Sequence, residues 1–277
     1  MLNPVTDALV TKLKRCVPEH LVRIAEPRYL EEPRGSWQGT AGVLVLPETT
    51  DQVASVVRCA NEHRVGIVPY GGGTGLVGGQ IYPQGPSVIL LSLERMNTIR
   101  AVFPTENVIV VDAGAILADV QEAAKNVDRL FPLSLASEGS ARIGGNLATN
   151  AGGVNVLRYG NTRDLCLGLE VVMADGSIWN GLTRLRKDNT GYDLRNLVIG
   201  SEGTLGIITA AALKLAPLPN SYGTALMVTP SPEAALGLLA LARSHLAEGI
   251  SAFELMHRQG YDFLTETLPD LRQPFER

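Results

Sequence analysis

The sequence predicts a globular fold that mixes α-helices with β-strands. Short runs of apolar, often β-branched residues recur along the chain between glycines and prolines, which is typical of buried strands. Other stretches carry apolar residues at helical spacing. The 29 glycines are concentrated in three clusters, at residues 71–79, 139–153 and 200–206. Such clusters predict loops whose backbone closely approaches a ligand, although tight turns of a β-rich fold are the alternative.

The first elements follow from these patterns in order. Residues 1–37 are predicted to form a helical lead-in, because Leu9 and Leu13 begin an apolar helical face. Thr49 is a typical helix N-cap and precedes a stretch with one apolar face. Strands are expected at residues 42–47, 65–69, 88–93 and 108–111, and helices after Thr49 and over residues 117–125.

The second half of the chain begins with a hairpin signal. Asp175 and Gly176 lie between two β-rich runs, which predicts a tight primed turn. Prolines at positions 217 and 219 follow a strand at 207–215 and mark a domain boundary. Beyond them, strands are expected at 225–229 and 252–256, with helices at 232–246 and from Arg258. Because this small unit cannot cover both faces of its own sheet, we expect either a truncated chain or completion by a partner.

Composition excludes several classes of protein. The chain has 277 residues, 45% of them hydrophobic, and a net charge of -4, which excludes a disordered chain and argues against nucleic-acid or membrane-surface binding. Residues 65–93 lack charge but hold eight glycines and three prolines, so no membrane span is expected. Three scattered cysteines and a polar beginning without a secretory segment predict a cytoplasmic protein.

The first glycine cluster contains a formal GxGxxG match at Gly73, Gly75 and Gly78. A dinucleotide-binding Rossmann unit needs a helix at the third glycine, whereas QIYPQGP follows here and cannot be helical. The lysine of a nucleotide-binding P-loop is also missing. Consecutive backbone N–H groups of residues 71–76 could instead form a nest for phosphate oxygens.

With its neighbours, this loop resembles a known family. PYGGGTGLVGG is similar to the pyrophosphate loop of the vanillyl-alcohol-oxidase (PCMH-type) flavoproteins, and SEGSARIGGNLATNAGG and IGSEGTLGIIT are similar to their next two flavin segments. The resemblance covers about residues 38–256. It implies a PCMH-type FAD-binding domain of two α+β subdomains at 38–217. The start of an incomplete α/β substrate (cap) domain would follow at 221–277.

The same resemblance implies which residues contact FAD. The first loop would hold the pyrophosphate, the second segment would line the rest of the cofactor, and the third would lie near its ribose and adenine. The implied residues are Pro69, Gly71, Gly72, Gly73, Thr74, Gly75, Leu76, Gly139, Ser140, Gly144, Gly145, Thr149, Asn150, Gly152, Gly153, Glu202, Gly203, Gly206 and Ile207.

Two expectations concern cofactor chemistry. Thr74 occupies the place where some family members attach FAD through histidine, so FAD is expected to bind non-covalently. No two of the histidines have the spacing of metal ligands on one element. In the family that the chain resembles, the metal-binding histidines come from the rest of the cap domain and a C-terminal segment, so the resemblance implies that a divalent metal of the complete enzyme takes its ligands from outside this chain. The four histidines are His20, His63, His245 and His257.

Within the family, LRKDNTGYDLRNLVIGSEGTLGIIT and SAFELM are similar to D-2-hydroxyglutarate dehydrogenases. The resemblance implies oxidation of a D-2-hydroxy acid by hydride transfer to flavin N5, with a quinone or an electron-transfer flavoprotein as acceptor. D-lactate dehydrogenase, glycolate oxidase flavin subunit, and an FAD-binding module without catalysis stay as alternatives. The sequence identifies no catalytic residue, and it leaves a homodimer open.

A few residues are candidates for the substrate side. Asn155, Arg158 and Tyr159 follow the second flavin segment and could face the flavin, or Arg158 could pair with a surface carboxylate. Asn189 could hydrogen-bond the flavin edge, or it could serve the turn that follows it. His257 stands where the family commonly has aspartate.

Overall fold

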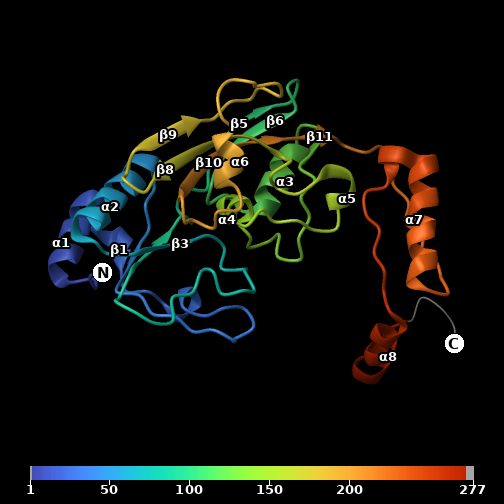
Figure 1. The fold of residues 1–277 in the computed structure, drawn as a ribbon, viewed down its shortest axis with the longest axis horizontal. Coiled ribbons are helices and arrows are strands. Elements are labelled where there is room, and N and C mark those ends of the chain that lie inside the picture. The colour runs from blue at the N-terminus through green and yellow to red at the C-terminus, as the bar shows by residue number, and fades with distance from the viewer. Residues whose placement is uncertain (1, 273–277) are drawn as a thin grey trace.

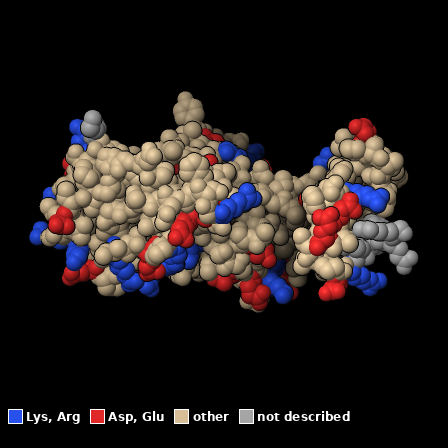
Figure 2. All heavy atoms as spheres, turned by 90° about the horizontal axis from the view of Figure 1, so that it is seen from below, with Lys and Arg blue, Asp and Glu red and all other residues tan. Residues whose placement is uncertain are grey.

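The computed structural model describes residues 2–272. Figure 1 shows a main body that contains the sheets and a C-terminal arm, residues 218–272, that extends away from it with helices α7 and α8. On the face shown in Figure 2, acidic and basic side chains are interspersed among a majority of other residues, and no patch of a single sign dominates. No helix among residues 2–272 combines the length and apolar character needed to cross a bilayer.

The first sheet is four-stranded and mostly parallel, with the order β1-β2-β4-β3. Its strands are β1 (Val22–Arg23), β2 (Val43–Val45), β3 (Ile67–Tyr70) and β4 (Ile89–Ser92). Helix α2 (Thr50–His63) connects β2 to β3, which lie on either side of β4, and Thr49 caps the helix by accepting a hydrogen bond from the N–H of Gln52. Helix α1 (Asp7–Cys16) packs on α2 with Leu9 and Leu13 buried.

The second sheet is five-stranded and antiparallel, with the order β5-β6-β10-β8-β9. Its strands are β5 (Ile99–Phe103), β6 (Val108–Asp112), β8 (Cys166–Met173), β9 (Ile178–Gly181) and β10 (Gly206–Lys214). The remaining helices of the main body are α3 (Leu117–Lys125), α4 (Ile143–Ala148), α5 (Val156–Tyr159), α6 (Leu194–Val198) and the short 3₁₀ helices η1 (Glu19–Leu21) and η2 (Pro27–Tyr29). Two short strands, β7 (Arg129–Leu130) and β11 (Ala216–Pro217), pair with each other. Helix α4 packs on the central strand β10. This arrangement confirms the predicted α+β fold of the main body.

The turn between β8 and β9 differs from the prediction. A primed turn needs positive φ at its first central residue or at both, yet of Asp175 and Gly176 only Gly176 has it, at 79°. The Asp175 carboxylate accepts hydrogen bonds from the N–H and hydroxyl of Ser177, at 2.8 and 2.6 Å. The prediction of a primed turn was therefore wrong, because the aspartate side chain organises the turn from an ordinary backbone conformation.

The arm contains the predicted helices without the predicted strands. Helices α7 (Pro232–Leu246) and α8 (Arg258–Thr267) form, with the turn η3 (Ala247–Gly249) after α7. Residues 225–229 and 252–256 pair with no strand in the described part of the chain. A strand exists only through hydrogen bonds to a neighbour, so both strand predictions were wrong. The division of the chain at 217 stays a prediction.

His257 has a defined structural role. Its Nδ1 accepts a hydrogen bond of 3.1 Å from the N–H of Gln259 and caps α8. Aspartate is a favoured cap because its side-chain oxygen accepts the same bond. The histidine at this position is therefore compatible with the start of the helix.

A buried polar network links the second sheet to α2. The Glu170 carboxylate, 8% exposed, accepts hydrogen bonds from Arg100 (3.0 Å), Thr50 (2.7 Å) and Thr209 (2.9 Å). Arg100 also donates to Asp112 at 2.6 Å. Burial of the Glu170 carboxyl opposes its ionisation, but the hydrogen bonds from Arg100 and the two threonines outweigh burial and lower its pKa below the ordinary 4.5.

The Glu170→Gln substitution tests this network. We expect it to lower the free energy of unfolding by about 2 kcal/mol at neutral pH, because hydrogen bonds to a charged group are lost. A lowered pKa in the folded state stabilises the protein above the ordinary pKa, and that contribution disappears as pH falls through the folded value. The difference between variant and wild type should therefore shrink below pH 4.5.

Urea unfolding at several pH values measures this difference. Glu106→Gln is the matched control, since Glu106 is exposed and pairs with Arg184 at 3.0 Å. Its effect should not exceed about 0.5 kcal/mol. A Glu170→Gln effect that is as small as the control, or that does not change with pH, would show that the network does not stabilise the fold.

Candidate functional site

The three glycine clusters meet at one cavity of about 280 Å³. Its walls come from the end of β3, the loop after it, helix α4 and the start of β10, with Leu93 and Ala113 following β4 and β6. Both sheets therefore contribute to the cavity. Segments more than one hundred residues apart in sequence are brought together there.

The first loop packs directly on the second cluster. A Cβ added to Gly71 would lie 3.4 Å from the Cα of Gly145, and one added to Gly72 would overlap the carbonyl oxygen of Ser140. Gly73 has a φ of 70°, and a side chain there would overlap the hydroxyl of Tyr70. Gly72 and Gly73 therefore require glycine, whereas a Cβ at Gly71 would make only an ordinary van der Waals contact.

The backbone of the loop presents free donors. No N–H of residues 72–77 donates a hydrogen bond to another residue in the described range 2–272. Two carbonyl groups of the loop are held by the side chain of Gln80, which donates to Gly75 at 2.8 Å and to Gly73 at 3.5 Å. Consecutive N–H groups without partners are the donors that an anion-binding nest uses.

The aromatic layer beneath the loop is buried. Tyr70 donates to the carbonyl oxygen of Arg28 at 3.1 Å, and its ring lies 5.1 Å from that of Tyr29 in an edge-to-face arrangement. Burial raises the pKa of both phenols, that of Tyr29 to about 12. Both tyrosines therefore stay neutral at physiological pH and support the loop from below.

The third cluster closes the cavity. Gly203 has a φ of 79° and a side chain there would lie 2.9 Å from the Cγ of Pro69. The N–H groups of Gly200 and Glu202 donate to the carbonyl oxygens of Leu147 and Ala148 at 3.1 and 3.0 Å, which fastens this loop to α4.

Thirteen of the nineteen residues implied by the resemblance line the cavity. They are Pro69, Gly71, Gly72, Gly73, Thr74, Gly75, Gly144, Gly145, Thr149, Glu202, Gly203, Gly206 and Ile207. The other six lie outside the lining, namely Leu76, Gly139, Ser140, Asn150, Gly152 and Gly153. Several of these are structural: the Asn150 side chain accepts from the N–H of Arg163, and a side chain at Gly153 would overlap the carbonyl oxygen of Ser134.

Sequence reasoning missed other lining residues. They are Tyr70, Val77, Gly79, Gln80, Leu93, Ala113, Leu135, Ser137, Arg142, Asn146, Ala148, Ala151, Ser201 and Ile208. Most flank the glycine motifs, and several come from strand ends that no motif marks. Arg142 and Asn146 could have been found, because they are polar residues four positions apart within the second segment.

The substrate-side candidates do not line this cavity. Asn155 donates to the carbonyl oxygen of Pro132 at 3.0 Å, and the guanidinium of Arg158 lies 5.0 Å from the Tyr159 ring centre. Within residues 2–272, Arg158 makes no ion pair, so the alternative pairing with a carboxylate is not seen either. Asn189 lies in the exposed segment 184–194.

No histidine lines the cavity. His63 donates a hydrogen bond from Nδ1 to the carbonyl oxygen of Cys59, 2.8 Å away, and the other three histidines are exposed. Throughout residues 2–272, no group of three His, Cys, Asp or Glu side chains is arranged to hold a metal ion.

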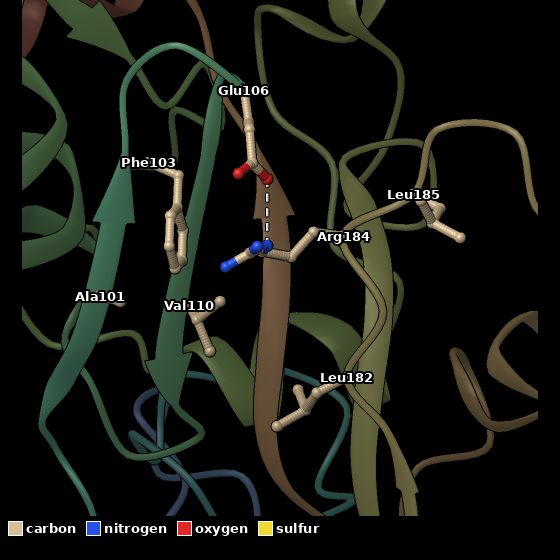
Figure 3. Close-up of a pocket in the computed structure, with 7 residues that line it drawn as sticks. All are labelled: Ala101, Phe103, Glu106, Val110, Leu182, Arg184 and Leu185. Atoms are coloured by element: carbon tan, nitrogen blue, oxygen red, sulfur yellow. Dashed lines mark ion pairs between the residues drawn. The ribbon is translucent and has the colours of Figure 1, made fainter.

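A second cavity of about 470 Å³ lies on the second sheet and is drawn in Figure 3. Arg184 lines this cavity. Its Cζ atom lies 3.7 Å from the centre of the Phe103 ring, and its Nε atom pairs with the Glu106 carboxylate at 3.0 Å. Aliphatic side chains such as Val110 and Leu182 form the rest of the wall. Because its only charged groups neutralise each other, this cavity offers no free polar group for chemistry.

Comparison with known families identifies the domain that contains the first cavity. The model of the family described as FAD binding domain matches residues 41–181, which include β2, the first loop and α4. The chain belongs to this FAD-binding domain family. The resemblance stated from the sequence is thereby confirmed.

Several named enzymes are similar in sequence to this chain. The chain is 42% identical over 258 residues to D-2-hydroxyglutarate dehydrogenase of Bos taurus, and the match covers 91% of this chain and 46% of the relative. A D-2-hydroxyglutarate–pyruvate transhydrogenase of Saccharomyces cerevisiae is 38% identical, covering 87% and 48%. A putative D-lactate dehydrogenase of Schizosaccharomyces pombe is 40% identical, covering 84% and 43%. The chain spans about half the length of these relatives.

Solved structures support the same fold. Alkyldihydroxyacetonephosphate synthase superposes with a TM-score of 0.73 at 23% identity, covering 88% of this chain and 50% of that one. The grass pollen allergen Phl p 4, a glucose dehydrogenase, gives 0.66 at 22% identity, covering 77% and 44%. At this identity the comparison shows the fold alone.

The expected cytoplasmic location is contradicted by the relatives. The dehydrogenases of Bos taurus, Rattus norvegicus, Danio rerio and Oryza sativa are mitochondrial. The sequence argument failed because free cysteines and the lack of a secretory segment argue only against the secretory pathway. Neither observation separates one reducing compartment from another.

The cavity of the FAD-binding domain fits its cofactor. FAD carries a pyrophosphate, and the free N–H groups of residues 72–77 offer donors for phosphate oxygens. Asn146 lines the cavity with a buried Nδ2 that has no acceptor in the described residues. An unpartnered buried donor is costly, so its presence indicates a ligand that accepts from it.

The Gly73→Val substitution tests the first loop. We expect loss of bound FAD, because valine cannot adopt positive φ without strain and its Cβ would overlap the Tyr70 hydroxyl. Gly223→Val is the matched control, since Gly223 does not line the cavity, has no positive φ, and no heavy atom lies within 4 Å of the added Cβ. The flavin absorbance per mole of purified protein measures retention. Flavin content equal to that of the wild type in Gly73→Val would show that the loop is only a turn.

Proposed function

We propose that this chain is the FAD-binding part of a dehydrogenase that oxidises a D-2-hydroxy acid, with D-2-hydroxyglutarate as the preferred substrate. The observation that carries the proposal is the 42% identity across 91% of the chain to a D-2-hydroxyglutarate dehydrogenase. The cavity geometry supports it, because the matched residues include all three cavity-forming segments. FAD supplies the chemistry when bound, as the acceptor of a hydride from C2 of the substrate.

The residues of the chain would bind and orient the cofactor. The N–H groups of the first loop would hold the pyrophosphate, and Gly144 and Gly145 would allow close approach along α4. Gly206 and Ile207 would lie near the adenine end. The cofactor would thus lie between the two sheets, held at fixed distance from both subdomains.

The finer assignments are part of the same proposal. Residues 38–217 would be the FAD-binding domain, and residues 221–277 would begin a substrate domain. A quinone or an electron-transfer flavoprotein would take the electrons, and a homodimer would be the assembly. The polypeptide around the substrate would supply any divalent metal ligands.

FAD is proposed to be bound non-covalently. Thr74 lines the cavity and its hydroxyl is a poor nucleophile for flavin attachment, and none of the four histidines lines it. Acid precipitation should therefore release all of the flavin into the supernatant as intact FAD. Yellow colour retained in the pellet after washing would contradict this prediction and show a covalent bond.

Anaerobic reduction tests the proposed activity. The protein is purified from the organism that makes it, so that any accompanying polypeptide is retained, and mixed with D-2-hydroxyglutarate. We expect the visible flavin absorbance to bleach, and L-2-hydroxyglutarate to leave it unchanged.

The same assay separates the alternatives. The Schizosaccharomyces pombe relative favours D-lactate as the second candidate substrate. Bleaching by D-lactate or glycolate but not by D-2-hydroxyglutarate would favour those enzymes. Bound FAD that no hydroxy acid reduces would contradict the dehydrogenase assignment and leave an FAD-binding module.

A further inference from the structure

Helix α4 and the residue before it place two polar side chains on the cavity wall. Arg142 is the N-cap position of α4 and Asn146 lies within it, four residues further on. The N–H of Asn146 donates to the carbonyl oxygen of Arg142 at 2.9 Å, so the two residues are one helical turn apart. Both line the cavity formed by the three glycine clusters.

Asn146 is a buried donor without an acceptor. Its side chain is 4% exposed, and no described residue accepts from its Nδ2. Leaving such a group unpaired costs more free energy than an ordinary hydrogen bond contributes. The cost is explained if a ligand in the cavity accepts from it.

Arg142 is the single lysine or arginine on the described cavity wall. Its guanidinium has five N–H donors, and one hydrogen bond is seen, from Nη1 to the carbonyl oxygen of Gly114. No described carboxylate oxygen lies within ion-pair distance of it. The carboxylate of Glu94 instead accepts from Tyr29 and Arg28.

The environment of Arg142 makes a missing counter-charge costly. Its side chain is half-buried, and burial lowers the pKa of the guanidinium even though Glu94 partly opposes this effect. Arginine nevertheless stays charged in proteins. A half-buried cation without a carboxylate partner is stabilised by an anion that enters the cavity.

The location of the two side chains points to one part of the cofactor. The first loop rests on the segment that carries them: Gly72 contacts Ser140 and Ala141, and Gly71 contacts Gly145. The loop itself contains no lysine or arginine between residues 65 and 93. Its N–H groups provide partial charges only, whereas a pyrophosphate carries full negative charge.

We propose that Arg142 and Asn146 bind the pyrophosphate of FAD together with the backbone N–H groups of residues 72–77. Arg142 supplies the formal positive charge that the loop lacks, and Asn146 supplies a neutral donor. The inference rests on the proposed function only in assuming that FAD occupies this cavity.

Binding of cofactor fragments tests the proposal. FAD, ADP, adenosine and riboflavin are titrated into the flavin-free chain by calorimetry, without substrate. Arg142→Met should weaken FAD and ADP binding about tenfold, because a charge-assisted hydrogen bond is lost. Adenosine and riboflavin, which lack the pyrophosphate, should bind as they do to the wild type. Arg142→Lys should retain most of the affinity, and Asn146→Leu should weaken FAD and ADP about threefold.

Arg129→Met is the matched control. Arg129 is also half-buried, but it donates to the side chain of Asn107 at 2.6 Å and does not line the cavity. Its substitution should leave all four affinities unchanged. If Arg142→Met does not fold, Arg142→Gln carries the same prediction, since glutamine retains a donor for the Gly114 carbonyl group without the charge.

The outcomes separate the two proposals. Unchanged FAD and ADP affinity in a folded Arg142 variant would overturn the inference, and so would an equal loss for riboflavin. A wild-type chain that binds neither FAD nor ADP would overturn the assignment of the cavity and this inference with it. Bound FAD that no hydroxy acid reduces would contradict only the proposed dehydrogenase activity.

Discussion

The close contact between the first two glycine clusters is the constraint on which the rest of the site depends. Gly72 lies against the backbone of Ser140, and Gly71 lies against Gly145. A β-carbon at Gly72 would meet a carbonyl oxygen, which cannot move as a flexible side chain can. The contact fixes the end of β3 on α4. Because the loop is fixed by packing, its N–H groups are not used for its own stability and are free for a ligand.

A second contact between the two sheets is made by charged and polar side chains rather than by close packing of glycines. Glu170 on β8 accepts from Thr50 on α2, and Arg100 bridges Glu170 and Asp112 across the second sheet. Packing of glycines is insensitive to pH, whereas this network depends on ionised carboxylates. The cavity lies between elements held by both kinds of contact. The orientation of the two sheets is therefore fixed before the cofactor enters, which reduces the entropy lost on binding.

The sequence predicted the elements that carry their own signals and missed those that depend on neighbours. Helix α2 has a cap and an apolar face, and α3 was predicted at the residues it occupies. Strand β5 was missed because Arg100 interrupts its apolar pattern. That arginine is tolerated in the sheet since Asp112 and Glu170 satisfy it. The glycine motifs gave thirteen of the lining residues, fewer than half. The sequence marks Arg142 and Asn146 only as polar candidates, because the lack of an ion-pair or hydrogen-bond partner is a property of the fold.

The arm also separates elements that local sequence specifies from elements that depend on neighbouring strands. Helix α7 is complete although Leu236 and Leu246 are 67% and 61% exposed, because a helix satisfies its backbone internally and Ser231 caps it. Residues 225–229 have the composition of a strand, yet Val228 is 77% exposed and unpaired. β-Propensity describes how well a side chain fits a half-buried surface that a neighbouring strand must help to form. Local sequence therefore specifies the helices of the arm. A strand at residues 225–229 would need a neighbouring strand to pair with, and the described residues provide none. The arm contributes no residue to the described cavity wall, so the shape of this cavity is set by elements of the main body.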